Sequence, residues 1–230
     1  MIRTLRDLLL ACFLMTTAAT ANAQVVIYRS CAVSDGSSLI AALTAFYDSI
    51  SGVAKPAATL YSDIFNGDSP TTHVLVEDFT SYEALEAWRN RVAQSPAALL
   101  QLGASANSAA SCQSEGLALE VGFWGDRDAV TDYHFVFPIS TTDAARYAAA
   151  FAQLAEDLDS PGPTGLYVNR SGVPDTTHFV VQWGPSLAAL NHWADEYPQS
   201  RAFERFSEEV SSIRTVGLIF QRQTLTSWND

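Results

Sequence analysis

Two halves of the sequence resemble each other at a constant offset. A Thr-Thr-His tripeptide that ends at His73 recurs 105 residues later, where it ends at His178. A fixed offset between similar segments is typical of a chain built from repeated structural units. The sequence therefore predicts two copies of one domain of about 100 residues, an ordinary domain size. The same offset matches Gly67 with Gly172, Ser81 with Ser186, Leu85 with Leu190 and Trp88 with Trp193.

The match extends upstream in the same register. Without a gap, Tyr28 corresponds to Tyr133 and Phe46 to Phe151. We therefore expect the duplication to span nearly the whole chain that follows residue 23.

Each half has the same order of apolar and turn-forming segments: strand, helix, strand, strand, helix, strand. Such a βαββαβ unit is ferredoxin-like, with both helices on one face of a four-stranded antiparallel sheet. In the first repeat, residues 24–126, the expected elements are Val25–Cys31, Ser37–Ser51, Ala57–Ile64, Thr72–Phe79, Ser81–Gln94 and Gly116–Trp124. In the second repeat, residues 127–230, they are Asp132–Ile139, Thr141–Leu158, Gly165–Arg170, Thr177–Trp183, Ser186–Ile213 with a break near Pro198, and Val216–Thr224.

The strand sequences predict what lies on the other face of each sheet. The segment Phe179–Trp183 carries bulky residues at both alternating positions, which is typical of a strand buried on both faces. Because the helices cover only one face, we expect the two uncovered faces to pack on each other. The predicted fold class is α+β, with two ferredoxin-like repeats packed sheet to sheet.

The first residues have the form of a secretory signal. Arg3 and Arg6 precede an apolar segment at 8–15, and a small-x-small cleavage site ends at Ala23. We expect residues 1–23 to be removed and the chain to be exported to the periplasm or the extracellular space. The apolar segment is shorter than the roughly 18 residues of a spanning helix, so we expect no membrane association after cleavage.

The charge of the chain narrows its possible partners. The sequence has 13 Lys and Arg against 25 Asp and Glu, a formal net charge of −12 at pH 7. Binding to phosphate backbones needs clustered Lys and Arg, whereas Lys55 is the single lysine and the arginines are scattered. We therefore expect neither nucleic acid nor an anionic membrane surface as a partner.

The second half resembles a known group of proteins. The strand Phe179–Trp183 ends in an aromatic residue and is followed by Leu190 and then by Pro198-x-x-x-Ala202-Phe203 in a short second helix. This pattern resembles the dimeric α/β-barrel superfamily, in particular its antibiotic-biosynthesis-monooxygenase-like branch.

The resemblance implies that two such units form one barrel. Here a single chain would supply both, so we expect a monomer with an intrachain pseudo-dimer. Phe79 precedes Leu85 by six residues, the usual spacing of the superfamily, whereas Trp183 precedes Leu190 by seven.

The resemblance leaves the activity open. The superfamily includes cofactor-free oxygenases of phenolic polyketides, haem-degrading enzymes, isomerases and proteins with no known activity, and its ligand pocket usually lies between helices and sheet. Haem-degrading relatives have a histidine in the second helix region. The corresponding segments, Phe203–Ser207 and Leu99–Gly103, contain none, so we expect no haem and no other cofactor.

Two cysteines, Cys31 and Cys112, remain after the expected cleavage. An even number in an oxidising compartment favours one disulfide, with a pair of thiols or metal ligands as the alternative. In a ferredoxin-like unit the first strand lies antiparallel beside the fourth. Cys31 ends the first strand and Cys112 lies just before the fourth, so a bridge would hold the expected loop 103–115. Neither cysteine has a histidine nearby, and we expect no metal site.

His73 and His178 are candidates because both halves have them at the entrance of a strand, where a histidine can act as a base or a ligand. The alternative is a turn-proximal residue hydrogen-bonded to neighbouring threonines. His73 shares a strand face with Glu77, and His178 with Gln182. The loss of the acid in the second half argues against a paired metal site.

Aromatic residues are the other candidates, since an apolar cleft with a few polar tips is the usual form of a small-molecule site. Core packing explains Trp88 and Trp193 equally well, because both lie at helical spacing from a leucine. The candidate ligand-binding residues are Tyr28, Tyr61, His73, Phe79, Trp88, Tyr167, His178, Trp183 and Trp193.

Three functions remain open. The first, which we favour, is binding of a small apolar or aromatic molecule without catalysis. The second is a cofactor-free monooxygenase or isomerase acting on a small aromatic or phenolic substrate, in which Tyr133 or His134 takes a proton. Trp183 and Trp193 would then hold the substrate. The third is a structural or interaction protein whose clefts are filled by side chains.

Overall fold

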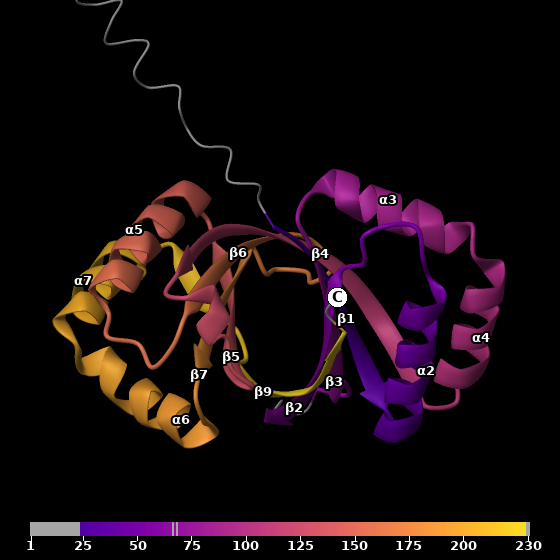
Figure 1. Cartoon of the computed structure of the whole chain (residues 1–230). Helices are drawn as coiled ribbons and strands as arrows, with labels where there is room; N and C mark the ends of the chain where they lie inside the picture. Colours follow the sequence, from indigo (N-terminus) through magenta and orange to yellow (C-terminus); the bar gives the residue numbers. More distant parts are fainter. Residues whose placement is uncertain (1–23, 66, 68, 229–230) are drawn as a thin grey trace, which may run out of the picture.

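A computed structural model describes residues 24–65, 67 and 69–228, so the expected signal peptide lies outside the described residues. Figure 1 shows helices on two opposite sides of a central sheet. The first half contains β1 (Val25–Val33), α2 (Gly36–Ser49), β2 (Ala57–Phe65), β3 (His73–Phe79), α3 (Tyr82–Ala93), α4 (Pro96–Ala106) and β4 (Ala110–Trp124). The second contains η1 (Arg127–Ala129), β5 (Tyr133–Thr141), α5 (Ala144–Asp157), β6 (Thr164–Ser171), β7 (His178–Gly184), α6 (Leu187–Glu196), η2 (Tyr197–Gln199), α7 (Arg201–Val210), β8 (Arg214–Val216) and β9 (Phe220–Trp228).

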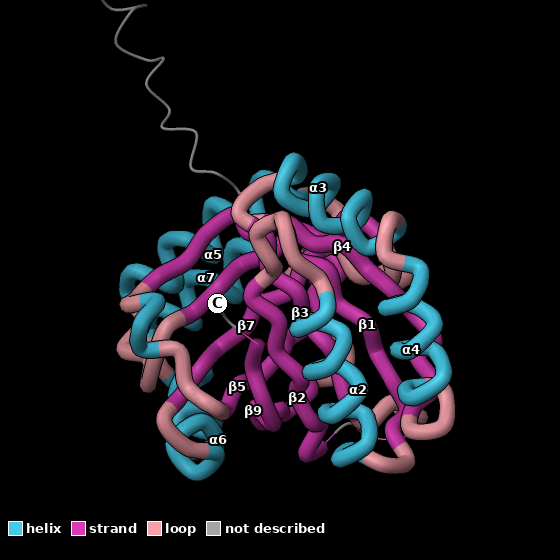
Figure 2. The backbone as a smooth tube through the Cα atoms, turned by 45° about the vertical axis from the view of Figure 1, so that its right-hand side comes forward, coloured by secondary structure: helices cyan, strands magenta, loops and turns pink. Residues whose placement is uncertain are grey.

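The strands form one antiparallel sheet that closes on itself. Their order is β7-β6-β4-β1-β3-β2-β9-β5-β8, and an additional pairing of β7 with β5 completes a ring. Helices α2, α3 and α4 lie outside β1–β4, and α5, α6 and α7 lie outside β5–β7 (Figures 1 and 2). The α+β class is therefore confirmed. No helix in the described part of the chain is long and apolar enough to cross a membrane.

The two halves join at their strand edges. Strand β2 pairs with β9, and β4 pairs with β6. The helix-free faces point at each other across a barrel interior, and the strands of the two halves are continuous in one sheet. Edge pairing satisfies backbone N–H and C=O groups that free sheet edges would leave without protein partners.

Side-chain caps fix where the helices begin. Asp35 and Asp143 accept a hydrogen bond from the backbone N–H three residues ahead, at the starts of α2 and α5. Ser81 and Ser186 do the same for α3 and α6. Short polar side chains at this position pair backbone donors that the first helical turn leaves free.

Upstream of β2, the two halves correspond at an offset of 108 residues, because β1 and β5 as well as the N-caps Asp35 and Asp143 are 108 residues apart. The ungapped matches of Tyr28 with Tyr133 and of Phe46 with Phe151 are therefore wrong. Tyr28 lines the barrel interior, whereas Tyr133 packs against the core beneath the second-half helices. The loops that follow α2 and α5 absorb two residues of the three-residue difference, and the turns that precede β3 and β7 absorb the third, as exposed loops readily do.

Two hydrophobic cores lie between the sheet and its helices. The first includes Ile27, Leu43 and Trp88, and the second includes Phe135 and Leu190. Alternate residues of each strand point the other way, into the barrel, because side chains alternate faces along a strand.

The disulfide between Cys31 and Cys112 is present, with an S–S distance of 2.02 Å, and the two residues are register partners in β1 and β4. The loop expected at 103–115 is wrong. Helix α4 continues to Ala106 and β4 already begins at Ala110. The bridge therefore joins two paired strands rather than holding a loop.

The strand expected at Val216–Thr224 is interrupted. Strand β8 ends at Val216 and β9 begins at Phe220. Pro138 of β5 lies opposite this break and accepts a hydrogen bond from the Gly217 N–H at 2.8 Å. Proline has no N–H to donate to a neighbouring strand, so a regular ladder cannot continue past it.

Candidate functional site

Three of the cavities in the described part of the chain are lined by sequence-predicted site residues. The first cleft, between the sheet and helices α2, α3 and α4, has a volume of about 550 Å³. The second cleft, between the sheet and the second-half helices, has about 260 Å³. The barrel lumen, bounded by the inward faces of strands from both halves, has about 200 Å³.

The structure divides the sequence-predicted site residues among these cavities. His73 and Tyr133 line none of the three, and His178 lies behind the second cleft with its ring 5.3 Å from that of Tyr147. The lumen is lined by Tyr28, Tyr61, His134, Tyr167 and Trp183. The first cleft is lined by Phe79 and Trp88, and the second cleft is lined by Trp193.

Trp183 and Trp193, expected to hold one substrate together, therefore lie on opposite sides of the sheet. Likewise, His134 lies in the lumen, away from Trp193. The structure does not bring the expected base and both tryptophans into one site.

The polar groups of the first cleft satisfy one another. Glu77 is buried and forms an ion pair with Arg29. The Tyr47 hydroxyl donates to Glu77 Oε1 at 2.9 Å, and Arg29 Nε also bonds Glu115 Oε2 at 3.0 Å. Tyr47 in turn stacks on Trp88, with ring centres 6.0 Å apart. A buried charge that is paired and hydrogen-bonded in this way is typical of a structural network.

The second cleft lacks this charge pair. By strand register, Phe137 occupies the place of Arg29 and Gln182 that of Glu77. Gln182 is satisfied by protein: it accepts from the Thr164 hydroxyl and donates to the carbonyl oxygens of Gly162, Pro163 and Trp183. The floor of the second cleft is consequently neutral.

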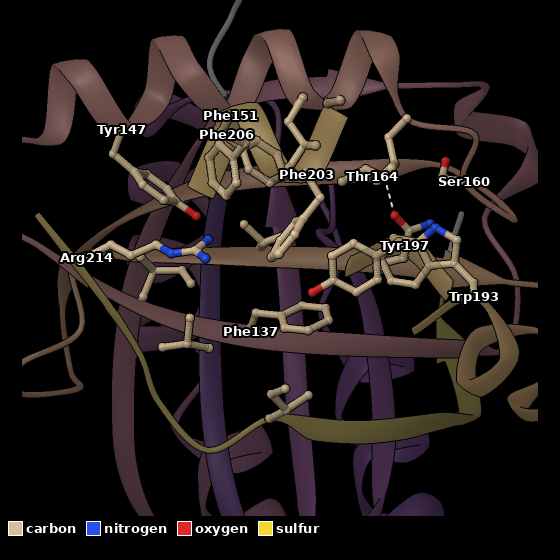
Figure 3. A pocket seen from close by; sticks show the side chains of 18 residues that line it. Phe137, Tyr147, Phe151, Ser160, Thr164, Trp193, Tyr197, Phe203, Phe206 and Arg214 are labelled. Carbon is tan, nitrogen blue, oxygen red and sulfur yellow. Dashed lines mark hydrogen bonds between the residues drawn. The ribbon is translucent and has the colours of Figure 1, made fainter. Parts of the chain in front are cut away.

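Aromatic rings form the walls of the second cleft. Tyr197, in the short turn between α6 and α7, stacks on Trp193 with ring centres 4.3 Å apart and meets Phe203 edge-on at 4.8 Å. Pro198 follows Tyr197 in the 3₁₀ turn that interrupts the helix where the sequence predicted a break. The aromatic lining comprises Phe137, Tyr147, Phe151, Trp193, Tyr197, Phe203 and Phe206 (Figure 3).

Arg214 is the charged group in this aromatic lining. Its guanidinium lies 4.7 Å from the Phe206 ring centre and 5.7 Å from that of Phe203. The Tyr147 hydroxyl points toward it (Figure 3). Burial raises the pKa of Tyr147, and the Arg214 charge only partly opposes this rise. Tyr147 is therefore neutral at physiological pH, and within the described residues no carboxylate forms an ion pair with Arg214.

A second polar group lies across the cleft. The indole Nε1 of Trp193 is buried and has no hydrogen-bond partner among the described residues. A buried donor without a partner costs free energy, so a ligand oxygen at this point would be favourable. Arg214 thus gives the cleft its one charged lining group among the described residues, and Trp193 adds a buried donor without a partner there.

The residues of the second cleft do not fit a haem. No histidine, cysteine or methionine is found in its lining within the described chain, and its tyrosines Tyr147 and Tyr197 have raised pKa values because they are buried. The described residues also contain no cluster of three or more His, Cys, Asp or Glu side chains that could hold a metal ion.

Comparison with known proteins places the fold among dimeric α/β-barrel proteins. No protein-family model matches the sequence, and no curated protein matches it. Solved structures do match, and they include chlorite dismutase-like and monooxygenase-like barrels.

One of these structures is an anthrone oxidase-like protein, with a TM-score of 0.60 and 13% identity over 90% of this chain and 93% of that one. A candidate monooxygenase from Fusobacterium nucleatum has a TM-score of 0.59 and 12% identity over 90% and 94%. A chlorite dismutase variant from Candidatus Nitrospira defluvii, in complex with cyanide, has a TM-score of 0.54 and 11% identity over 89% and 92%. At these identities the likeness shows the fold alone.

Sequence reasoning missed most of the second cleft. Phe203 and Phe206 are spaced to share one face of α7, a signal that could have placed them beside Trp193. Arg214 has no such signal, because a single arginine after a helix is indistinguishable from a solvated one until the fold is known.

Proposed function

We propose that this chain is an exported protein that binds a small aromatic molecule bearing an anionic oxygen, in the second cleft. Arg214 carries the proposal. It lies against aromatic rings, with no carboxylate paired to it among the described residues, in a cavity whose other lining residues are uncharged and mostly apolar. A guanidinium in such a place offers paired donors of fixed geometry to a carboxylate or phenolate.

The proposal includes a tandem duplication, with repeats at residues 24–126 and 127–230. Two observations support it. The strand orders β4-β1-β3-β2 and β9-β5-β7-β6 are the same arrangement in the two halves. Equivalent helices also begin at identical capping residues, Asp35 and Asp143 or Ser81 and Ser186.

Export is supported by the signal-like composition of residues 1–23 and by the Cys31–Cys112 disulfide. Disulfides persist chiefly in oxidising compartments. The periplasm and the extracellular space both meet this condition.

Binding without catalysis is favoured over the monooxygenase or isomerase alternative. The expected bases Tyr133 and His134 do not line the second cleft. His178 is buried and its pKa is lowered by burial, so the imidazole is neutral, but the ring of Tyr147 packs against it. The scaffold alternative would require the second cleft to admit no ligand.

Isothermal titration calorimetry of the full mature chain tests the proposal with 1-naphthoate and its neutral analogue 1-naphthalenemethanol. We expect naphthoate to bind at least tenfold more tightly, and R214Q to abolish this preference. R205Q is the matched control, because Arg205 pairs with Asp157 on the surface outside the cleft. Equal affinities for the two probes would contradict the proposal, and binding of neither would support the scaffold alternative.

A further inference from the structure

The barrel lumen is a second cavity, separated from the second cleft by the sheet itself. Along β7, Val180 and Gln182 line the second cleft, whereas Phe179, Val181 and Trp183 line the lumen. Because neighbouring residues of a strand face opposite sides, the two cavities have independent linings. The aromatic side chains of the lumen are Tyr28, Tyr61, His134, Tyr167, Phe179, Trp183 and Phe220.

Most carboxylates in and around the lumen have an arginine partner. Asp63 pairs with Arg222 at 2.7 Å, and that aspartate is almost wholly buried. Glu120 pairs with Arg127, and Glu77 pairs with Arg29 across the sheet.

Asp78 is the exception. It lines the lumen, and within the described residues its carboxylate has neither an ion pair nor a side-chain hydrogen bond. Burial, together with the charges of Glu120 and Glu77, raises its pKa to about 7, although the Arg127 charge opposes the rise. Because Arg222 is neutralised by Asp63, Asp78 gives the lumen an uncompensated negative charge whenever it is ionised.

His134 places an unpartnered nitrogen in the same cavity. The residue is 3% exposed, and its Nδ1 is buried without a hydrogen-bond partner in the described part of the chain. Burial and the nearby Arg222 charge lower its pKa well below the usual value, so the ring is neutral. A neutral imidazole has one acceptor nitrogen. The centre of its ring lies 4.5 Å from that of the Tyr61 ring. Burial raises the pKa of Tyr61, and the charge of Asp78 raises it as well.

We propose that the lumen binds a small organic cation, a primary ammonium group carried on one aromatic ring. Asp78 supplies the opposite charge, His134 accepts an ammonium N–H, and Tyr61, Tyr167 and Trp183 surround the cation with aromatic rings. Cations are attracted to such rings, more strongly where water is excluded. The net charge of −12 raises the local concentration of cations around the protein.

The buried indole N–H of Trp183 supports the same site, because it too has no hydrogen-bond partner among the residues that the structure describes. An oxygen on the ligand would satisfy it. Two residues that each carry an unpartnered buried nitrogen among the described residues, His134 and Trp183, thus line one cavity of about 200 Å³. This volume restricts the ligand to about the size of a single substituted ring.

Calorimetric titration of the full mature chain with benzylamine and with its neutral isostere benzyl alcohol tests the proposal. At pH 8 we expect benzylamine to bind at least tenfold more tightly, and D78N to remove this preference. D195N is the matched control, because Asp195 is an exposed residue of α6. Titrations at pH 6 should show weaker benzylamine binding to the wild type, since Asp78 must lose its proton to pair with the cation.

Tryptophan fluorescence locates the site and remains informative if D78N fails to fold. Benzylamine should change the emission of W193F, which retains Trp183, and leave that of W183F unchanged. Equal binding of the two probes, an unaltered preference in D78N, or a response that survives in W183F would each overturn the lumen site. Because the second-cleft proposal rests on naphthoate and Arg214, either proposal can fail while the other holds.

Discussion

The Arg214 guanidinium lies 4.7 Å from the centre of the Phe206 ring, on the wall of the second cleft. The ring holds the cation in the cleft without neutralising it. An ion pair in the same place would have consumed the charge that a ligand needs. The contact therefore links the stability of α7 to the binding capacity of the cleft.

Replacing Phe206 by leucine keeps a buried apolar side chain but removes the aromatic ring. We expect the free energy of unfolding to fall by about 1–3 kcal/mol, from lost aromatic packing and incomplete filling of the site. Naphthoate affinity should fall as well, because Arg214 loses its support. Chemical denaturation and calorimetry measure the two effects. F65L, at a residue 60% exposed, should change stability by less than about 0.5 kcal/mol.

The Cys31–Cys112 bridge closes a long segment of chain, with a sequence separation of 81 residues. Loss of this cross-link frees the unfolded chain, and loop-closure entropy predicts a destabilisation of about 4 kcal/mol. Urea denaturation of the double variant C31A/C112A should show it, as should reduction of the wild-type protein. A double variant that is insensitive to reductant but as stable as the wild type would contradict the prediction.

Asp78 should make stability depend on pH. Its pKa is raised from 3.8 to about 7 in the folded state, so between about pH 4 and pH 7 the unfolded chain loses this proton while the folded chain keeps it. Stability is therefore lost as pH rises through this window, by at most about 4 kcal/mol. Thermal melts of the wild type and D78N from pH 4 to pH 8 test this. The wild type should lose stability relative to D78N as pH rises. Parallel curves of stability against pH for the two proteins would refute the raised pKa of Asp78. The buried His134 titrates in both proteins, so its contribution cancels in the difference in stability between the wild type and D78N.

Arg222 and Asp63 connect β9 to β2 across one junction of the two halves. Their side chains are 13% and 1% exposed, so R222M would leave a buried aspartate without its counter-charge. We expect a loss of about 3–5 kcal/mol, measured by urea denaturation. R205M breaks a surface pair whose side chains are 60% and 37% exposed, and should cost less than about 1 kcal/mol. Similar effects of the two variants would show that the junction does not depend on the buried pair.

The order of the elements could be predicted from the sequence because capping residues and strand periodicity are local signals. Ser81 and Ser186 mark helix starts without knowledge of the fold, and the Cys31–Cys112 bridge followed from the strand order. The register of the first strands could not be found in this way. Tyr28 and Tyr133 are the same residue type 105 residues apart, but β1 and β5 correspond at an offset of 108 residues. This three-residue difference places the two tyrosines on opposite faces of the sheet.

The candidate sites were less predictable for a geometric reason. Gln182 and Trp183 are adjacent in the sequence, yet one faces the second cleft and the other the lumen. The aromatic content of the sequence predicted both Trp183 and Trp193 as binding residues. Only the closed sheet shows that they line different cavities. The break opposite Pro138 was equally hidden, because the proline and residues 217–219 meet only once β5 pairs with β8 and β9.

Ring closure through β9 also has a consequence for biosynthesis. Strand β9 pairs with both β2 and β5, so a nascent chain that has not yet produced residues 220–228 leaves two strands with open edges. Such edges are sites of mispairing between chains. The barrel can complete only after nearly all of the described chain has left the ribosome. A chaperone that covers β2 and β5 during this interval would protect them, and synthesis stalled just before Phe220 should yield aggregates rather than a smaller folded unit.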